Sequence, residues 1–188
     1  MSKRPVVVGI CGSLRDTSYT RMALSHALEA AEHAGAETRL IDLRLWDLPL
    51  FDPDDRDRGD AAELKRVVAA ADGIFLATPV YHGMVSSGLK NAFDYLGKDE
   101  FSGKIVGLLA TAGGGSYAQT LEHLRTGVRT VHGWTLPHEV GIRNASSQFE
   151  DGECIDRNLE ERIQRLGRMV VEHATVSTDD EHCIAADD

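Results

Sequence analysis

The sequence is poor in cysteine and has no long hydrophobic run, and both shortages exclude whole classes of protein. Its 188 residues include three cysteines, Cys11, Cys154 and Cys183, which are not spaced as metal ligands are. A sparse and odd count argues against a framework of disulfide bonds. No apolar run approaches the roughly 20 residues that a membrane-spanning helix needs. We therefore expect no metal site, no disulfide scaffold and no membrane association.

Positive charge is also scarce, since 20 basic residues face 30 acidic ones and the net charge is −10. This balance disfavours nonspecific binding to nucleic acid or to an anionic membrane. Only five of the basic residues are lysines. Few lysines among many acidic groups fit a salt-adapted cytoplasm and an ordinary acidic protein equally well. The first residues do not read as a secretory signal, so we expect a cytoplasmic protein.

The length suffices for one sizeable core and is short for two. Hydrophobic residues make up 42% and charged residues 27% of the chain, which is ordinary for a globular domain. We expect one domain over residues 1–174, followed by an acidic, disordered C-terminal tail over 175–188 that lacks helical periodicity.

Short apolar runs alternate with segments of helical periodicity along the chain. Five runs are predicted as strands: 5–10, 37–42, 73–78, 104–111 and roughly 134–140. Five segments are predicted as helices: 18–34, 60–71, 88–97, 117–131 and 155–173. Three of the strand candidates are almost continuously apolar, as parallel strands covered on both faces are. The pattern predicts an α/β fold in which a doubly wound, five-stranded parallel sheet forms a three-layer α/β/α sandwich.

In such sheets ligands bind at the carboxyl ends of the strands, so the loops after the first, third and fourth strands matter most. The first is rich in hydrogen-bond donors. Its donor side chains are Ser13, Arg15, Thr17, Ser18, Thr20 and Arg21. Placed before a helix N-terminus, they favour an anion such as a terminal phosphate. The glycine patterns of dinucleotide and P-loop sites are absent, and a plain helix cap with solvated arginines is the alternative.

Cys11 raises the possibility of a different chemistry. Phosphatases of this topology use a cysteine nucleophile in a loop of the form C-x5-R, in which the arginine closes the phosphate ring. Counted from Cys11, that arginine falls at position 17, which is Thr17, whereas Arg15 comes too early and Arg21 too late. Cys11 is therefore interpreted as a small buried residue at the end of a strand.

The other two loops are suited to a flat ring. The stretch PVYHGM begins at Pro79, which ends a strand, and carries an aromatic side chain at Tyr81 and a backbone-exposing Gly83. Ser86 or Ser87 can cap the next helix. His82 has no second ligand at metal spacing, which favours a packing or hydrogen-bonding role. In TAGGGSY, three consecutive glycines after a buried strand indicate either a flexible turn or a backbone that approaches a ligand closely.

The motifs GSLRDTSYTR, PVYHGM…GLKNAFDYL and TAGGGSY, in this order and spacing, resemble the NADPH-dependent FMN reductase family, which has the flavodoxin-like fold. The resemblance covers about residues 5–172. Many members have Glu-Tyr-Asn-Gly-Ser where this chain has residues 80–84, and a Pro-Gly pair where it has Ser86-Ser87. It implies a bound FMN, with NADPH or NADH as cosubstrate.

The resemblance also implies which residues contact the cofactor. In that family the first loop holds the FMN phosphate and the other two flank the isoalloxazine ring. Carried over, the contacts are Ser13, Arg15, Ser18, Thr20 and Arg21 in the first loop, Pro79, Val80, Tyr81, His82 and Gly83 in the second, and Ala112, Gly113, Gly114 and Ser116 in the third. No catalytic side chain is implied, because the cofactor carries the chemistry.

The implied activity is an oxidoreductase that moves a hydride from a nicotinamide to flavin N5. The electrons then pass to an acceptor such as free flavin, a quinone, an azo compound or a metal ion, and nothing in the sequence selects among these. A non-enzymatic electron carrier that binds FMN as flavodoxins do is the alternative. Family members are commonly dimers or tetramers, so we expect a homodimer or homotetramer.

Overall fold

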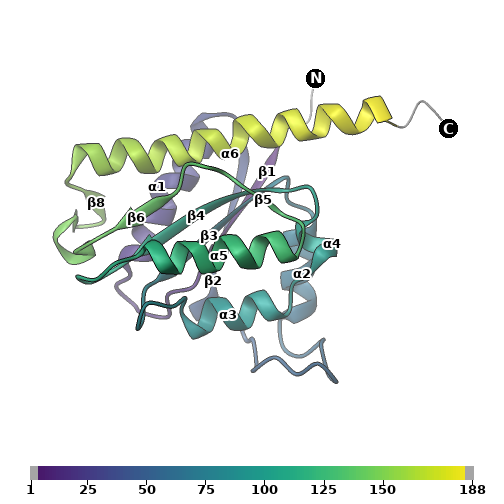
Figure 1. Cartoon of the computed structure of the whole chain (residues 1–188), viewed down its shortest axis with the longest axis horizontal. Coiled ribbons are helices and arrows are strands. Elements are labelled where there is room, and N and C mark those ends of the chain that lie inside the picture. The colour runs from purple at the N-terminus through teal and green to yellow at the C-terminus, as the bar shows by residue number, and fades with distance from the viewer. Residues whose placement is uncertain (1–3, 185–188) are drawn as a thin grey trace.

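The computed structural model describes residues 4–184, and side chains from residue 4 to residue 174. Its centre is a parallel sheet in the order β2-β1-β3-β4-β5 (Figure 1). The four long strands are β1 (Val6–Cys11), β2 (Glu37–Asp42), β3 (Gly73–Pro79) and β4 (Ile105–Thr111). This is the strand order of flavodoxin-like folds, which confirms the predicted fold class.

The predicted fifth strand is broken into two pieces. These are β5 (Trp134–Thr135) and β6 (Val140–Ile142), and both pair with β4. Ile105 pairs with Trp134 and Leu109 with Val140, so the partner advances six positions where β4 advances four. Pro137 lies in the interruption and has no N–H to donate to a ladder. The continuous strand predicted over 134–140 is therefore wrong in its middle.

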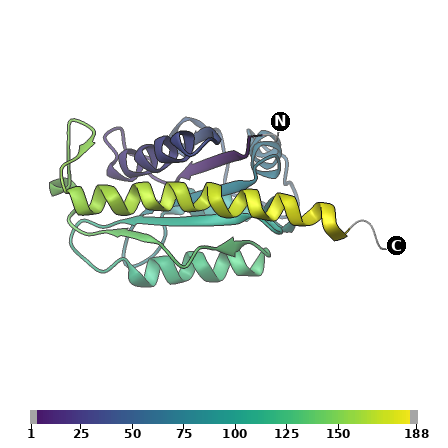
Figure 2. The ribbon, with the colours of Figure 1, turned by 90° about the horizontal axis from the view of Figure 1, so that it is seen from above.

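Helices cover both faces of the sheet. They are α1 (Tyr19–His33), α2 (Ala61–Ala69), α3 (Ser87–Asp94), α4 (Lys98–Phe101), α5 (Ala118–Thr130) and α6 (Arg157–Ile184). Leu24 of α1 and Ile163 of α6 belong to the core on one face, whereas Leu64 of α2, Leu89 of α3 and Leu121 of α5 belong to the core on the other. Figure 2 shows the strands running between α1 and α5, which makes the three layers visible.

The last helix is longer than the sequence predicted. A disordered tail is expected from residue 175, but α6 continues as a helix to Ile184. No glycine or proline follows Gly167 in the sequence, so no residue breaks the helix there. Residues 185–188 of the expected tail lie outside the described residues. Within residues 4–184, no helix combines the length and the apolar character that crossing a bilayer requires.

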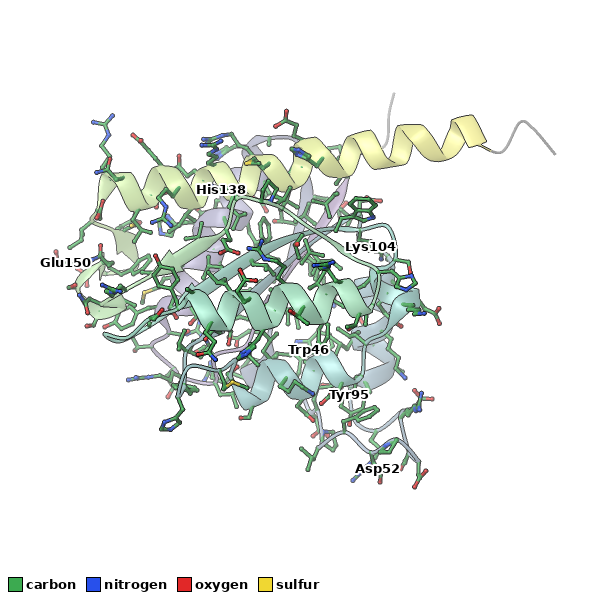
Figure 3. All side chains as sticks on the ribbon, viewed as in Figure 1. Trp46, Asp52, Tyr95, Lys104, His138 and Glu150 are labelled. Atoms are coloured by element: carbon green, nitrogen blue, oxygen red, sulfur yellow. The ribbon has the colours of Figure 1, made fainter. Side chains whose placement is uncertain are left out.

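The long polar segment 43–60 is partly anchored to the core. It begins with the short 3-10 helix η1 (Leu43–Leu45). The Asn91 side chain on α3 then donates to the Leu48 carbonyl at 3.1 Å and the Pro49 carbonyl at 2.9 Å, and accepts from the Phe51 N–H at 2.8 Å. The Tyr95 hydroxyl also donates to the Pro49 carbonyl, at 2.8 Å, and Figure 3 places Asp52 at the outer end of this segment. One half-buried amide therefore fixes the path of the segment.

Helices α1 and α6 approach each other closely at Gly167. A Cβ atom on this residue would lie 2.4 Å from the Ala27 carbonyl oxygen and 2.8 Å from the Ala30 Cβ. Both distances are far below van der Waals contact, and one of the groups is backbone that has little freedom to move. The small residue therefore permits the spacing of the two helices that cover one face of the sheet.

We expect Gly167→Ala to lower the free energy of unfolding by about 1–3 kcal/mol, because the methyl group forces α6 away from α1. The matched control is Gly127→Ala, in the middle of α5, where the nearest atom to a new Cβ is a Phe93 ring carbon at 3.3 Å. Urea unfolding of both variants checks this. Equal stabilities of the two variants would contradict the assigned role of Gly167.

Candidate functional site

Three loops meet at one edge of the sheet because the strands that precede them are in register. Cys11 at the end of β1 pairs with Ala77 of β3, and Pro79 at the end of β3 pairs with Thr111 at the end of β4. The loops after β1, β3 and β4 therefore leave the sheet side by side, as the sequence analysis expected.

Between these loops lies a cavity of about 380 Å³. One part of its wall is polar and comes from the first loop and the start of α1: Ser13, Arg15, Thr17, Ser18, Tyr19 and Thr20. The other part comes from the ends of β3 and β4 and from the segment after β6: Pro79, Val80, Tyr81, Thr111, Ala112, Gly113, Ala145 and Ser146. The cavity therefore offers an anion-binding wall beside a less polar one.

The first loop presents most of its donors to this cavity. Ser18 is the N-cap of α1, and its hydroxyl accepts from the Arg21 N–H at 3.1 Å. Ser13 is buried, whereas Arg15 is exposed on the cavity wall. The first turn of α1 adds the partial positive charge of a helix N-terminus. This arrangement suits a phosphate group and argues for more than a plain helix cap.

Arg21, by contrast, binds its own loop. Its Nη1 donates to the Arg15 carbonyl at 3.3 Å and to the Asp42 carboxylate at 3.1 Å. Its Nη2 donates to the Asp16 carbonyl. Arg21 does not line the cavity, so the guanidinium shapes the loop around the polar wall.

Three further hydrogen bonds hold the loops and the helices that follow them. The Ser86 hydroxyl, at the N-cap of α3, donates to the Gly12 carbonyl at 2.7 Å and accepts from the Leu89 N–H at 3.2 Å. The Thr20 and Thr111 hydroxyls lie 2.5 Å apart and join α1 to the end of β4. These hydrogen bonds are buried, so the polar groups that make them have a protein partner in place of water. Ser86, not Ser87, is the helix cap.

The second loop turns tightly at its tip. Tyr81 and Met84 exchange backbone hydrogen bonds of 3.1 and 2.9 Å. His82 and Gly83 between them have φ values of 52° and 75°, the left-handed region that two-residue hairpin turns require. Glycine meets that requirement without steric cost. The turn leaves His82 and Gly83 outside the cavity lining and keeps Tyr81 on it.

The glycines of the third loop are not required by internal packing. A Cβ on Gly113 or Gly115 would meet no heavy atom within 4 Å, and one on Gly114 would meet only the Asn144 side chain at 3.6 Å. Gly113 lines the cavity, whereas Gly114 and Ser116 do not. The Ser116 hydroxyl accepts from the Ala118 N–H at 3.3 Å, next to the start of α5. The open space over these glycines leaves room for a ligand.

Five lining residues lie outside the set implied by the resemblance: Thr17, Tyr19, Thr111, Ala145 and Ser146. Thr17 was among the donors of the first loop. Thr111 begins the TAGGGSY motif, so its place at the end of a buried strand could have identified it. Ala145 and Ser146 belong to η2 (Ala145–Ser147), after β6. The stretch 143–148, Arg-Asn-Ala-Ser-Ser-Gln, is rich in hydrogen-bond donors, and this signal could have identified the segment.

Cys11 does not fit a nucleophile. Its side chain is fully buried at the end of β1. Burial raises the pKa of the Cys11 thiol, so the reactive thiolate is disfavoured. Ser13 and later residues of the first loop line the cavity, whereas Cys11 does not. This geometry opposes the phosphatase alternative.

Comparisons with known proteins show which family the chain resembles. The sequence profile of the family described as NADPH-dependent FMN reductase matches residues 5–147. Among curated proteins, the NADPH azoreductase of Bacillus sp. (strain OY1-2) is 35% identical over 150 residues, which cover 78% of this chain and 80% of the relative. The FMN-dependent NADPH-azoreductase of Staphylococcus aureus (strain USA300) is 33% identical over 76% of this chain and 80% of its own length.

Solved structures share the fold. The flavoenzyme NAD(P)H:(acceptor) oxidoreductase FerB of Paracoccus denitrificans superimposes with a TM-score of 0.77. The match covers 92% of this chain and 98% of that chain at 21% sequence identity. At this identity the likeness supports the fold alone.

We expect Ser86→Ala to lower the free energy of unfolding by about 1–3 kcal/mol, because α3 loses its cap and the buried Gly12 carbonyl loses its donor. The matched control is Ser87→Ala, one residue further along, where the side chain is exposed. Chemical denaturation of both variants measures the difference. A Ser87 variant as unstable as the Ser86 variant would refute the assignment of the cap.

Proposed function

The chain belongs to the NADPH-dependent FMN reductase family, and from this premise we propose that the cavity between its three loops is the FMN site of an NAD(P)H-dependent oxidoreductase. The observation that carries the proposal is the division of the cavity wall into a donor-rich part and a part with few polar groups. FMN has the same division, with a dianionic phosphate at one end and a flat ring at the other. The domain proposed for this role is residues 1–174.

At the polar wall we propose that Ser13, Arg15, Ser18 and Thr20 contact the phosphate. Arg15 is exposed there and can present its planar fork to phosphate oxygens. Arg21 contributes indirectly, since its guanidinium holds the Arg15 and Asp16 carbonyls in place.

At the other wall we propose that the flat ring lies between the second and third loops. Its neighbours would be Pro79, Val80, Tyr81, His82, Gly83, Ala112, Gly113, Gly114 and Ser116. The Tyr81 side chain is 49% exposed at this edge, so it can pack against a ring without first leaving the core. His82, Gly83, Gly114 and Ser116 do not line the cavity, so their proposed contacts are at its rim.

When bound, FMN supplies the group that accepts a hydride from a nicotinamide and passes electrons to an acceptor. The protein's part is to bind, orient and shield. The hydroxyls and Arg15 fix the phosphate, and the Tyr81–Met84 turn and the glycine loop limit the approach to the ring. Among the described residues that line the cavity no carboxylate, histidine or lysine occurs.

For the acceptor we propose an azo compound, because both curated relatives are named as azoreductases. NADPH is the donor in both names, and we propose it as the preferred cosubstrate of this chain. The cytoplasmic location expected from the sequence stays a prediction.

We further propose that the chain assembles as a homodimer or homotetramer. Several large apolar side chains are exposed, among them Leu45 at 70% and Leu50 at 82%. Leu14, in the first loop, is also exposed, and with Leu50 it lines a second cavity of about 440 Å³. Contiguous exposed apolar patches commonly mark contact surfaces, and Leu14 and Leu50 meet at this cavity. Light scattering of the purified protein gives the mass, and a monomer at micromolar concentration would contradict the proposal.

The activity is tested by anaerobic absorbance spectroscopy of the FMN-loaded protein. We expect NADPH to bleach the oxidised-flavin band and an azo dye then to restore it with loss of its own colour. Flavin that binds but stays oxidised with both nicotinamides would favour the non-enzymatic electron carrier instead. Failure to bind FMN at low and at high salt would contradict the proposed site.

We expect Arg15→Ala to weaken FMN binding by about 1.5–3 kcal/mol, through loss of a charge-assisted bond to phosphate. This corresponds to a rise in Kd of roughly 10- to 150-fold. Riboflavin, which lacks the phosphate, should bind the variant and the parent equally. The matched control is Arg129→Ala, at the exposed end of α5. An unchanged FMN affinity in the Arg15 variant would remove Arg15 from the site.

A further inference from the structure

His26, on α1, joins three separate parts of the chain. Its Nε2 lies 3.0 Å from the Gly152 carbonyl oxygen and its Nδ1 lies 3.1 Å from Oε1 of Glu160. Gly152 is in the turn of the hairpin formed by β7 (Phe149–Glu150) and β8 (Glu153–Cys154), and Glu160 is in the first turn of α6. Figure 1 shows this hairpin beside the start of α6, and Figure 3 labels Glu150 on it.

Both partners of the His26 ring are hydrogen-bond acceptors. A backbone carbonyl can only accept, and an ionised carboxylate can only accept. A neutral imidazole has one N–H and can satisfy one of them, whereas the imidazolium has two and satisfies both. The geometry therefore selects the charged form of the ring.

The charges around His26 also favour the protonated ring. Burial lowers the pKa of His26, but the Gly152 carbonyl and the Glu160 carboxylate outweigh it, and the pKa is raised above the ordinary 6.5. Glu29 on α1 adds to the rise. From α6, Arg168 lines the small cavity next to His26 together with His33 of α1. From the hairpin, the Cys154 thiol faces Glu160, and burial raises the pKa of that thiol, which keeps it neutral.

The hairpin that His26 holds lies behind the wall of the proposed FMN site and supports it. The Phe149 ring stacks on the Tyr19 ring, with centroids 6.1 Å apart, and Tyr19 lines the cavity. The Phe149 ring also lies 6.2 Å from the His26 ring. Ala145 and Ser146, just before β7, line the same cavity. A movement of the hairpin therefore changes the wall through the Tyr19 ring and through the residues that precede β7.

We propose that His26 is a positioning residue of the cofactor site: as an imidazolium it fastens the hairpin Phe149–Cys154 to α1 and α6, and FMN affinity falls when that charge is lost. This inference rests on the proposed FMN site. When the ring loses its proton, one of its two acceptors loses a donor, and the hairpin keeps a weaker attachment. The loosened Phe149 then no longer fixes Tyr19 at the cavity wall.

The direction of the pH dependence follows from the raised pKa. The attachment contributes fully below about pH 6.5, the value for an unfolded histidine, and is lost as pH rises through the higher value of the folded state. The same sign holds for FMN affinity, which should be higher on the acid side of this transition.

The test measures the FMN dissociation constant by flavin fluorescence between pH 6 and 9, for the parent and three variants. In the parent we expect the affinity for FMN to fall about fivefold or more as the pH rises. About fivefold is the lower limit of the coupling commonly found between two sites in a protein. His26→Gln should bind FMN with one weakened affinity over this range. Glu160→Gln should keep a transition but move its midpoint to lower pH, because the neutral amide no longer favours the imidazolium. His33→Gln is the matched control and should keep the parent midpoint.

The ring itself is followed by nitrogen-detected NMR of the protein without FMN, so this readout is independent of the proposed function. His26 should titrate above pH 6.5, at the midpoint of the FMN curve. A neutral His26 at pH 6.5, or an FMN midpoint that Glu160→Gln leaves in place, would overturn the proposal. If FMN does not bind at all, the proposed function fails, while the NMR titration still decides the charge of His26.

Discussion

The parallel register of β1, β3 and β4 is the constraint on which the site depends. Because Cys11, Pro79 and Thr111 end their strands at one edge of the sheet, three loops distant in sequence leave it side by side. Register alone would leave the loops free to move. Buried bonds restrict them: the Ser86 hydroxyl binds the first loop, and the Thr20 hydroxyl binds the end of β4. The cavity is the space that remains between loops held in this way.

Some polar groups around the cavity bind other groups of the protein, and others are free to bind a ligand. Arg21 on α1 and Asp42 at the end of β2 form an ion pair of 3.1 Å, so both charges are used within the protein. Arg15, two positions beyond Ser13, is exposed on the wall. On the far side the His26 contacts play the same building role for the hairpin. The ligand-facing donors are therefore oriented by a second layer of ionic and hydrogen-bonded contacts, which limits their reorganisation on binding.

The sequence predicts the sheet well where strands are continuous apolar runs, as in 73–78 and 104–111, because buried parallel strands have no other pattern. The prediction fails at Pro137, where the chain leaves the edge of β4 and returns to it. It also fails for the two-residue strands on either side of the Asp151-Gly152 turn. The donor-rich loop predicts an anion site. It does not show that Arg21 binds the Arg15 and Asp16 carbonyls, because a long arginine side chain next to a loop can reach either a ligand or the backbone of that loop.

A crystal structure of the FMN-loaded protein tests the central claim most directly, since it shows where the cofactor lies. The account predicts the phosphate within hydrogen-bond distance of Ser13, Arg15 and Ser18, and the ring between Tyr81 and Gly113. A cofactor in the neighbouring cavity beside Trp46, or a phosphate held by groups outside the first loop, would contradict it.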